Sequence, residues 1–381
     1  MMLRWFTVTF LLLIFFAASG CQEALVWAGA NMYQKESKAP ESLTGAQIVR
    51  AGLDSSPRLR VGYLPTTTLG TVFSGLEELG QHGYRPNWTE KTGLVYTCSA
   101  GHIDIAHVRV ATDYTLLFSA KAYQQIMSGE TEYTFKLYEP SRYFVRLTYP
   151  ENWEHLSQKD KEDIAYNVSI RIGQYIAFCA TNWHEIITWF GYRSKGFEPE
   201  FPSAFTWEDI FSHLIGTHVA VLAIEDTEHT YNEAVTLALK KELQILGAQP
   251  GHVSKRASES VRGRWFSGDF FFITINKRNF DIGLDDGFVT PWLVPSVSEC
   301  EGAVAQPYPV PDIGTISEYG FSAKLEIEPR VWEGGAILDV AYHNSKKKGK
   351  RVEVAVHLPL IMDYIKEDGV RRYGPDVDTC P

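Results

Sequence analysis

The stretch EDIAYNVSIRIGQYIAFCATNWHEIITWF, residues 162–190, decides the fold class of this chain. Its apolar side chains recur with a helical period on almost every side, and Gly191 ends the pattern. A helix that is apolar nearly all round is buried, so this segment predicts the central helix of a large core. A stripe of small or polar residues shares one of its faces at spacings i, i+4, i+7 and i+11: Ala177, Thr181, His184 and Thr188. Unpaired buried polar groups cost about 1–3 kcal/mol each, so this stripe must face a partner that satisfies it.

The segments on either side of this helix complete the fold prediction. Helical patterns cover residues 41–53, 104–127, 207–223, 231–246 and 360–373. Strand-like runs cover residues 133–138, 143–148, 270–276, 321–328, 337–343 and 352–357. The run KKKGKR at 346–351 separates the last two strand-like runs, as a solvated hairpin tip would. We therefore expect residues 41–381 to form a single α+β domain, with a helical middle packed with a mostly antiparallel sheet.

The N-terminus has the features of an export signal. Arg4 precedes an apolar run over residues 5–16, which is too short to cross a bilayer, since a spanning helix needs about 20 apolar residues. The sequence Ala-Ala-Ser-Gly-Cys at 17–21 resembles a bacterial lipobox. We expect cleavage of residues 1–20, lipid on Cys21, a tether over residues 21–40, and anchoring on the periplasmic face of the outer membrane. An ordinary cleaved signal with an incidental cysteine is the alternative.

Composition narrows the class of protein. Hydrophobic residues make up 45% of the chain and charged residues 22%, which is typical of a globular protein. The net charge of −10 gives no electrostatic basis for nucleic-acid binding. Aromatic residues reach 13%, as expected for a large core or for a cleft that stacks flat or sugar-like ligands.

The remaining cysteines allow several interpretations. Cys179 lies in the apolar helical stretch and is expected to be an inert buried thiol. Cys300 and Cys380 both lie in loop-like sequence, so export would permit a bridge between them, although spacing cannot prove it. Cys98 stands a few residues before His102 and His107, which leaves a cysteine–histidine hydrolase open as a weaker hypothesis.

Three helical segments carry polar residues that suit a metal or acid–base site. Asp104 and His107 stand at i, i+3 near a helix start, and Asp209 and His213 stand at i, i+4 on a second helix. If the long central helix packs antiparallel to the second, His184 and Glu185 would meet Asp209 and His213. Asp209 has a plain alternative role, because it stands three residues after Thr206 and would complete a helix cap.

The same residues exclude one familiar chemistry. His-Glu-Ile-Ile-Thr at 184–188 lacks the second histidine of the zinc-protease motif, since Thr188 takes its place. His184 and Glu185 also point about 100° apart on a helix, so they should serve different neighbours. Nucleophile-elbow and phosphate-loop patterns are absent from the sequence.

Four longer motifs resemble an uncharacterised bacterial family, the domain of unknown function DUF4056. They are YTCSAGHIDIAHVR at 96–109, WHEIITWFG at 183–191, FPSAFTWED at 201–209 and NFDIGLDDG at 279–287. The resemblance implies an envelope protein of Gram-negative bacteria. It implies no activity, so no catalytic role is carried over.

Two functions follow as hypotheses. The first is a metal-assisted or acid–base hydrolase acting on envelope lipid or peptidoglycan fragments, with Glu185 and His184 as catalytic residues and Glu185 as the base that activates water. A divalent metal, zinc first, would be held by Asp104, His107, His184, Asp209 and His213. The second is a non-catalytic lipoprotein, a binding or assembly factor whose polar stripes are a hydrogen-bonded core. A solvent-reached site would favour the first and a sealed network the second.

Overall fold

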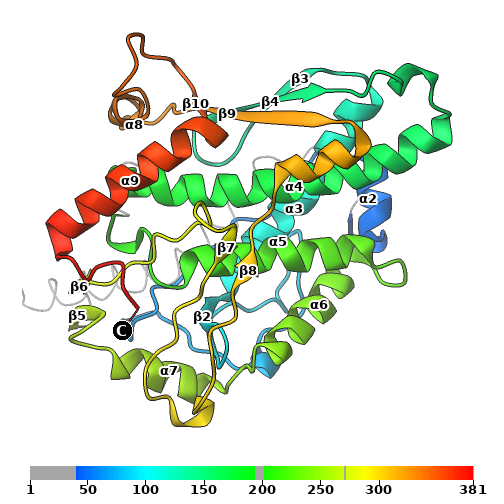
Figure 1. Cartoon of the computed structure of the whole chain (residues 1–381). Coiled ribbons are helices and arrows are strands. Elements are labelled where there is room, and N and C mark those ends of the chain that lie inside the picture. The colour runs from blue at the N-terminus through cyan, green and yellow to red at the C-terminus, as the bar shows by residue number, and fades with distance from the viewer. Residues whose placement is uncertain (1–39, 194–200, 270–271, 381) are drawn as a thin grey trace, which may run out of the picture.

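Three long helices form the centre of the protein: α3 (Ile105–Met127), α4 (Gln158–Trp189) and α5 (Asp209–Glu225). The computed structural model describes residues 40–193, 201–269 and 272–380, and Figure 1 shows these helices running through its middle. Helix α4 begins at Gln158 because the Ser157 hydroxyl accepts the Asp160 N–H, which satisfies one otherwise unpaired donor of the first turn.

Glycines bring α3 close to both of its neighbours. A Cβ placed on Gly173 of α4 would lie 2.2 Å from Ser119 Oγ, and one on Gly216 of α5 would lie 2.2 Å from the carbonyl oxygen of Val108. The Thr112 hydroxyl donates to the Gly216 carbonyl at 2.9 Å. The small residues of α4 and α5 therefore pack on α3, which is the partner that the central helix required.

A four-stranded antiparallel sheet covers this bundle in the order β10-β9-β4-β3. Its strands are β3 (Glu132–Lys136), β4 (Arg142–Thr148), β9 (Ser322–Glu328) and β10 (Val352–Glu353). Tyr133 and Phe135 alternate with exposed residues along β3, as expected for a strand with one buried face. The Phe135 ring lies 4.6 Å from that of Phe118, which joins the sheet to α3.

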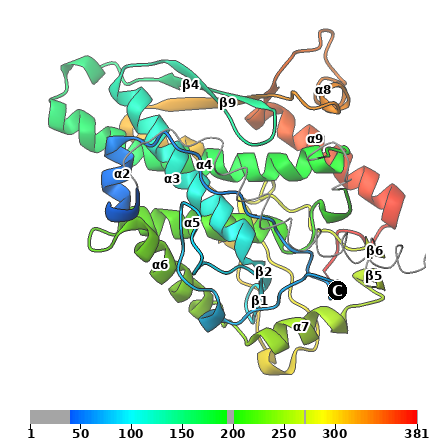
Figure 2. The same cartoon turned by 180° about the vertical axis from the view of Figure 1, so that it is seen from behind.

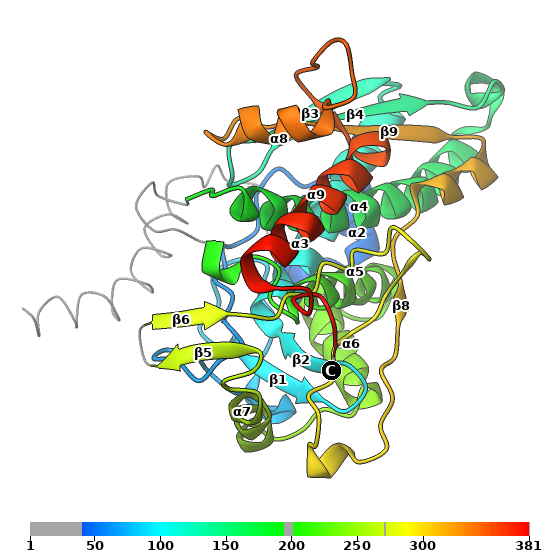
Figure 3. The ribbon, with the colours of Figure 1, turned by 60° about the vertical axis from the view of Figure 1, so that its left-hand side comes forward.

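The other elements surround this centre. Figure 2 shows α2 (Gly45–Ala51) beside α3, and Figure 3 shows the β1–β2 and β5–β6 hairpins near α7. The bounds of these surrounding elements are α6 (Tyr231–Ile245), α7 (Gly251–Ser260), α8 (Gly334–Ala341), α9 (Val354–Tyr373), β1 (Leu94–Thr97), β2 (Gly101–Asp104), β5 (Phe266–Asp269), β6 (Phe272–Ile275), β7 (Phe288–Val289) and β8 (Tyr308–Pro309).

Two hydrophobic cores hold these elements together. The large core extends along the chain from Ile48 to Val377. The smaller one gathers Trp207, Trp265 and Trp292 with aliphatic side chains of α7. The two cores together draw on all three described stretches of the chain.

The α+β class is confirmed, and the long helices begin and end close to the predicted positions. Two strand predictions are wrong. Residues 337–341 belong to helix α8, because Ile337 and Ala341 are buried four residues apart while Asp339 is exposed. Only Val352 and Glu353 pair as a strand, and α9 begins at Val354, where the His357 ring accepts the Glu353 N–H.

Among the described residues, no helix has the length and apolar character needed to cross a membrane. The expected signal peptide, Cys21 and the tether up to residue 39 lie outside the described residues.

Candidate active site

The predicted site residues meet where the N-termini of α3 and α5 approach the C-terminal part of α4. We call Asp104, His107, Glu208, Asp209 and His213 the histidine cluster. The Asp104 N–H donates to the Ser212 hydroxyl of α5 at 2.9 Å, and the Phe205 N–H donates to Glu185 of α4 at 3.0 Å. Both helix N-termini carry partial positive charge, which favours carboxylates at this junction.

Asp104 is the N-cap of α3. One of its carboxylate oxygens accepts the Ala106 N–H at 2.7 Å, and the other accepts the Tyr63 N–H at 2.5 Å. Burial raises the pKa of Asp104, whereas the positive charge of His107 and these two N–H groups oppose the rise. The side chain is therefore fixed by backbone donors on two sides.

His107 is the member of the cluster that solvent reaches most, with 23% of its side chain exposed. Its Nδ1 lies 3.2 Å from Asp209 Oδ1 and 3.9 Å from Asp104 Oδ2. Burial alone would lower the pKa of His107, but the two carboxylates outweigh burial and raise that pKa to about 10. His107 thus carries a positive charge at neutral pH.

His213 lies against His107, with the two ring centres 4.8 Å apart. Its side chain is buried, and its Nδ1 has no hydrogen-bond partner among the described residues. Burial, together with the positive charges of His107 and His184, holds the pKa of His213 well below the usual value for a histidine. The pKa values of the two neighbouring imidazoles are therefore shifted in opposite directions, so that His107 is charged and His213 is neutral.

Glu208 and Asp209 stand together at the start of α5. Asp209 accepts the Thr206 N–H at 2.7 Å and also pairs with His107, but the predicted cap is not formed, because Glu208 occupies the N-cap position and its side chain makes no cap bond. Burial and the charge of Asp209 raise the pKa of Glu208 well above its usual range. Glu208 is therefore protonated at neutral pH.

His184 and Glu185 border this cluster from α4. The Phe205 backbone that binds Glu185 has a φ of +56°, a left-handed conformation that is rare for such a side chain. The His184 ring lies 6.2 Å from that of Tyr192. His184 and Glu185 thus make these two different contacts, while the role of Glu185 as the base stays a prediction.

The metal ligands predicted from the sequence come together only in part. Asp104, His107, Asp209 and His213 are neighbours, and His184 is close enough for its charge to lower the pKa of His213. Within residues 40–193, 201–269 and 272–380, no three His, Cys, Asp or Glu side chains are arranged to hold a metal ion. Metal binding by this set stays a prediction.

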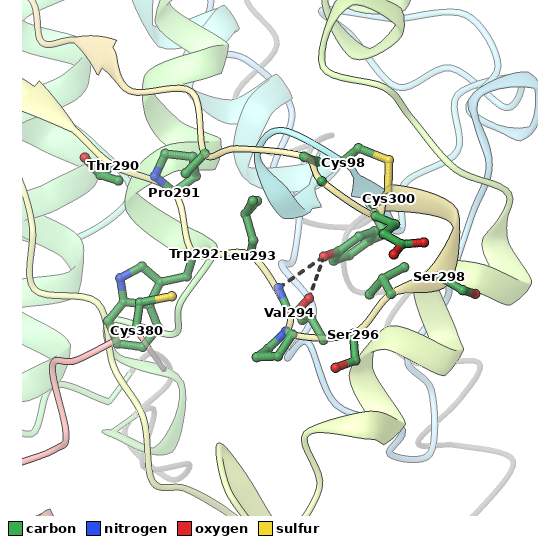
Figure 4. Close-up of a pocket in the computed structure, with 17 residues that line it drawn as sticks. Cys98, Thr290, Pro291, Trp292, Leu293, Val294, Ser296, Ser298, Cys300 and Cys380 are labelled. Carbon is green, nitrogen blue, oxygen red and sulfur yellow. Dashed lines mark hydrogen bonds between the residues drawn. A yellow bond between two sulfur atoms is a disulfide. The ribbon is translucent and has the colours of Figure 1, made fainter.

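A pocket of about 810 Å³ lies on the other side of the small core (Figure 4). Its wall includes Pro291, Trp292 and Leu293, and none of the histidine cluster lines it. Trp292 packs edge-on against Trp265 at 5.8 Å, which packs against Trp207 at 5.1 Å, just before Glu208. The pocket and the histidine cluster are therefore distinct, and contacts among three tryptophans link their surroundings.

The pocket also corrects the cysteine predictions. Cys98 forms a disulfide with Cys300, whereas Cys380 is a free thiol on the same pocket wall. The suggested Cys300–Cys380 bridge is wrong, because the end of β1 brings Cys98 next to the 298–300 turn. A cysteine nucleophile at position 98 is excluded in this structure, since its sulfur is already bonded. Cys179 is buried and free, as predicted.

No sequence pattern predicts several residues of the site. Gly62 lies against His107, so that a Cβ there would be 2.2 Å from Nε2. It belongs to an irregular segment with no periodicity to place it. Glu208 precedes Asp209 directly in the sequence, but adjacent residues of a helix usually point apart, so the spacing does not predict that both belong to one site. His102, which the sequence placed near Cys98, is buried on β2, and its ring bonds to the Ser254 carbonyl.

Comparison with known proteins places the chain in a family without assigning an activity. Residues 72–284, more than half of the chain, match the family described as "Protein of unknown function (DUF4056)". No curated protein and no solved structure matches the chain. The matched region contains the whole histidine cluster and the three central helices. The chain therefore belongs to the DUF4056 family, as the four motifs had suggested.

Proposed function

We propose that this protein is a hydrolase of the cell envelope that works by proton transfer between His107 and His213. The observation that carries the proposal is the opposite pKa shift of these two adjacent imidazoles. Environments that push the pKa values of neighbouring groups apart are typical of acid–base pairs in active sites.

The proposed reaction balances through this pair. His213, neutral at working pH, accepts a proton from water as the water oxygen attacks the electrophilic carbon or phosphorus of the substrate. His107 donates its proton to the leaving group as that bond breaks. Asp104 and Asp209 hold His107 in its charged form before the step. Solvent then returns a proton from His213 to His107, and the exposed edge of His107 is the side from which a substrate would approach.

The first test is a hydrolysis screen with envelope phospholipids and peptidoglycan fragments as substrates. The variants are His107→Ala and His213→Ala, and Glu185→Gln tests the base role predicted for that residue. His229→Ala is the matched control, because His229 forms a similar carboxylate–histidine pair with Asp226 on the surface. We expect each cluster variant to lose about a hundredfold in turnover or more, as removal of a general acid or base does. Equal activity in all variants would refute the proposal.

A divalent metal, with zinc as the first expectation, remains a proposal for the same residues. Metal analysis of the protein, purified without a metal-affinity step, tests it. Near-stoichiometric metal that is lost in both His184→Ala and His107→Ala would establish a metal centre. Metal-free protein that is active would leave the proton-transfer pair as the sole mechanism.

We also propose that the protein reaches the periplasmic face of the outer membrane as a lipoprotein, with lipid on Cys21. The lipobox-like sequence at 17–21 supports this. Cys21→Ser should abolish incorporation of a labelled fatty acid and move the protein out of the membrane fraction. Retained labelling in that variant would contradict the proposed anchor site.

A binding or assembly factor is the second candidate, and the burial of the cluster favours it. Asp104, Asp209 and His213 are each at most 3% exposed, and the 810 Å³ pocket contains none of them. In that case a fluorescent fatty-acid analogue or a muramyl dipeptide should bind at the pocket. Leu293→Asp would weaken this binding while His107→Ala would not, and the hydrolysis screen would be negative.

A further inference from the structure

We propose that the segment from Arg330 to Arg351 is a second membrane contact, which binds the anionic headgroups of a phospholipid bilayer. This segment, which we call the basic arm, contains helix α8 and the loop after it. Figures 1 and 3 show it projecting beyond β10, the edge strand of the four-stranded sheet. The proposal does not depend on the hydrolase activity or on lipid at Cys21.

The charge of the basic arm is opposite to that of the chain. Residues 330–351 contain six Lys or Arg side chains and only two carboxylates, in a protein with a net charge of −10. A local positive excess on an acidic protein attracts anionic surfaces over about 8 Å at physiological salt.

Part of this charge serves to hold the arm in place. Lys348 pairs with Asp339 at 2.6 Å and also donates to the Gly335 carbonyl, which ties the loop to α8. Arg351 pairs with Glu326 of β9 at 3.0 Å and stacks over the Phe144 ring. The base of the arm is therefore fixed to the sheet.

The remaining lysines are available to a ligand. Lys346, Lys347 and Lys350 are exposed, and they have no ion-pair partner among the described residues. They lie on one short loop held at both ends. Three unpaired ammonium groups on one loop suit the phosphates of several lipid headgroups, since each lysine near an anionic bilayer contributes about 1 kcal/mol to binding.

An exposed tryptophan distinguishes a bilayer from an acidic protein as the partner. Trp332, in the turn that enters α8, is 97% exposed and is the most exposed large hydrophobic side chain in the described ranges. Leaving such a side chain in water is unfavourable. Tryptophan prefers the headgroup region of a bilayer, where its ring is buried while its N–H stays hydrated. A tryptophan beside free lysines matches the surface that peripheral membrane proteins present to lipid.

Vesicle co-sedimentation tests the proposal with the full chain carrying Cys21→Ser, which lacks the cysteine expected to take lipid. The vesicles are phosphatidylglycerol mixed with phosphatidylethanolamine, and phosphatidylcholine alone serves as the neutral surface. The parent protein should bind the anionic vesicles, bind phosphatidylcholine weakly, and lose binding as salt rises. Replacing Lys346, Lys347 and Lys350 by Ala should weaken binding about a hundredfold.

A matched triple variant separates the basic arm from general charge. Lys159→Ala, Lys241→Ala and Lys255→Ala remove the same charge from exposed sites on α4, α6 and α7. This variant should bind nearly as the parent does, whereas Trp332→Ala should bind about tenfold more weakly. Equal loss in both triple variants, or no vesicle binding by the parent, would overturn the proposal. Binding to soluble polyglutamate but not to vesicles would overturn it in favour of an acidic protein partner.

Discussion

Two buried polar clusters share helix α3 and differ in how their charges are balanced. In the first, the charge network, Arg60 binds Asp113 at 2.6 Å and Glu90 at 2.7 Å, while Arg109 lies 3.4 Å from Glu90. His82 completes it at 3.0 Å from Asp113. Burial would raise the pKa of Glu90, but the guanidinium groups outweigh it and lower that pKa far below its usual range.

The histidine cluster shows the opposite balance. Its one cationic group, His107, faces Asp104 and Asp209, and Glu208 is left with a raised pKa and a carboxyl oxygen without a hydrogen-bond partner among the described residues. A buried network in which every carboxylate is paired with a guanidinium group stabilises a fold, whereas a buried cluster with more carboxyl groups than cations lowers its stability. The histidine cluster is therefore the better candidate for chemistry of the two buried clusters.

The largest expected effect comes from breaking the charge network. Arg60→Ala leaves Asp113 and Glu90 buried without their main partner and should lower the free energy of unfolding by about 3–5 kcal/mol. Arg146→Ala, which breaks exposed pairs with Glu132 and Glu326, should lower the free energy of unfolding far less, because solvent screens both pairs. Urea unfolding monitored by circular dichroism measures both. Similar losses in the two variants would remove the distinction between this network and a surface ion pair.

The pH dependence of His107 is expected to be the next largest effect. The folded pKa of about 10 exceeds the unfolded value of about 6.5, so its charge stabilises the fold fully below pH 6.5, and this contribution is lost as the pH rises through 10. His107→Gln should therefore cost about 2–4 kcal/mol at pH 6, and the cost should shrink toward pH 10. Nuclear magnetic resonance titration of the histidine rings provides the direct check. A cost that grows with pH would contradict the assignment.

Steric crowding at His107 gives a smaller effect. Gly62→Ala places a methyl group against Nε2 and should cost about 1–3 kcal/mol, while shifting the His107 ring away from Asp209. Gly335→Ala is the control, because a Cβ at Gly335 meets no atom within 4 Å. Thermal unfolding and the His107 titration should both change in the first variant alone. An unchanged His107 pKa would show that Gly62 does not position the ring.

The smallest expected effect has the opposite sign. Glu208 is protonated in the fold at pH 7 but ionised when unfolded, so its contribution to stability falls as the pH rises from about 4.5. Glu208→Gln cannot ionise and should raise the free energy of unfolding at pH 7 by about 0.5–2 kcal/mol. The gain should vanish near pH 4. A loss of stability at pH 7 would place Glu208 with the paired acids of the charge network.

The helices that build the site were predictable because their periodicity is long and their caps are explicit. Asp104 occupies the predicted position at the start of α3. The strand predictions at 337–343 and 352–357 are wrong, since a short run of apolar or small residues fits a strand and a short helix equally well. Tertiary burial decides between the two.

The site was predictable only where one helix carries two of its members. Asp104 with His107, and Asp209 with His213, follow from spacing along a helix. The contact with Gly62 depends on an irregular segment, and the contact between His107 and His213 depends on how α3 and α5 cross. Arg109 and Asp113 stand four residues apart on α3 but bind different partners, since Arg60 and His82 reach Asp113 from outside the helix.

The bridge between Cys98 and Cys300 makes a covalent ring of the chain between them, 202 positions apart. That ring contains α3, α4 and α5, and with them every residue of the histidine cluster. A protease that cuts once inside the ring leaves two fragments still joined, so a nicked molecule keeps its full mass on a gel until a reductant is added. Separating the two fragments of a nicked molecule therefore requires a reductant as well as a protease.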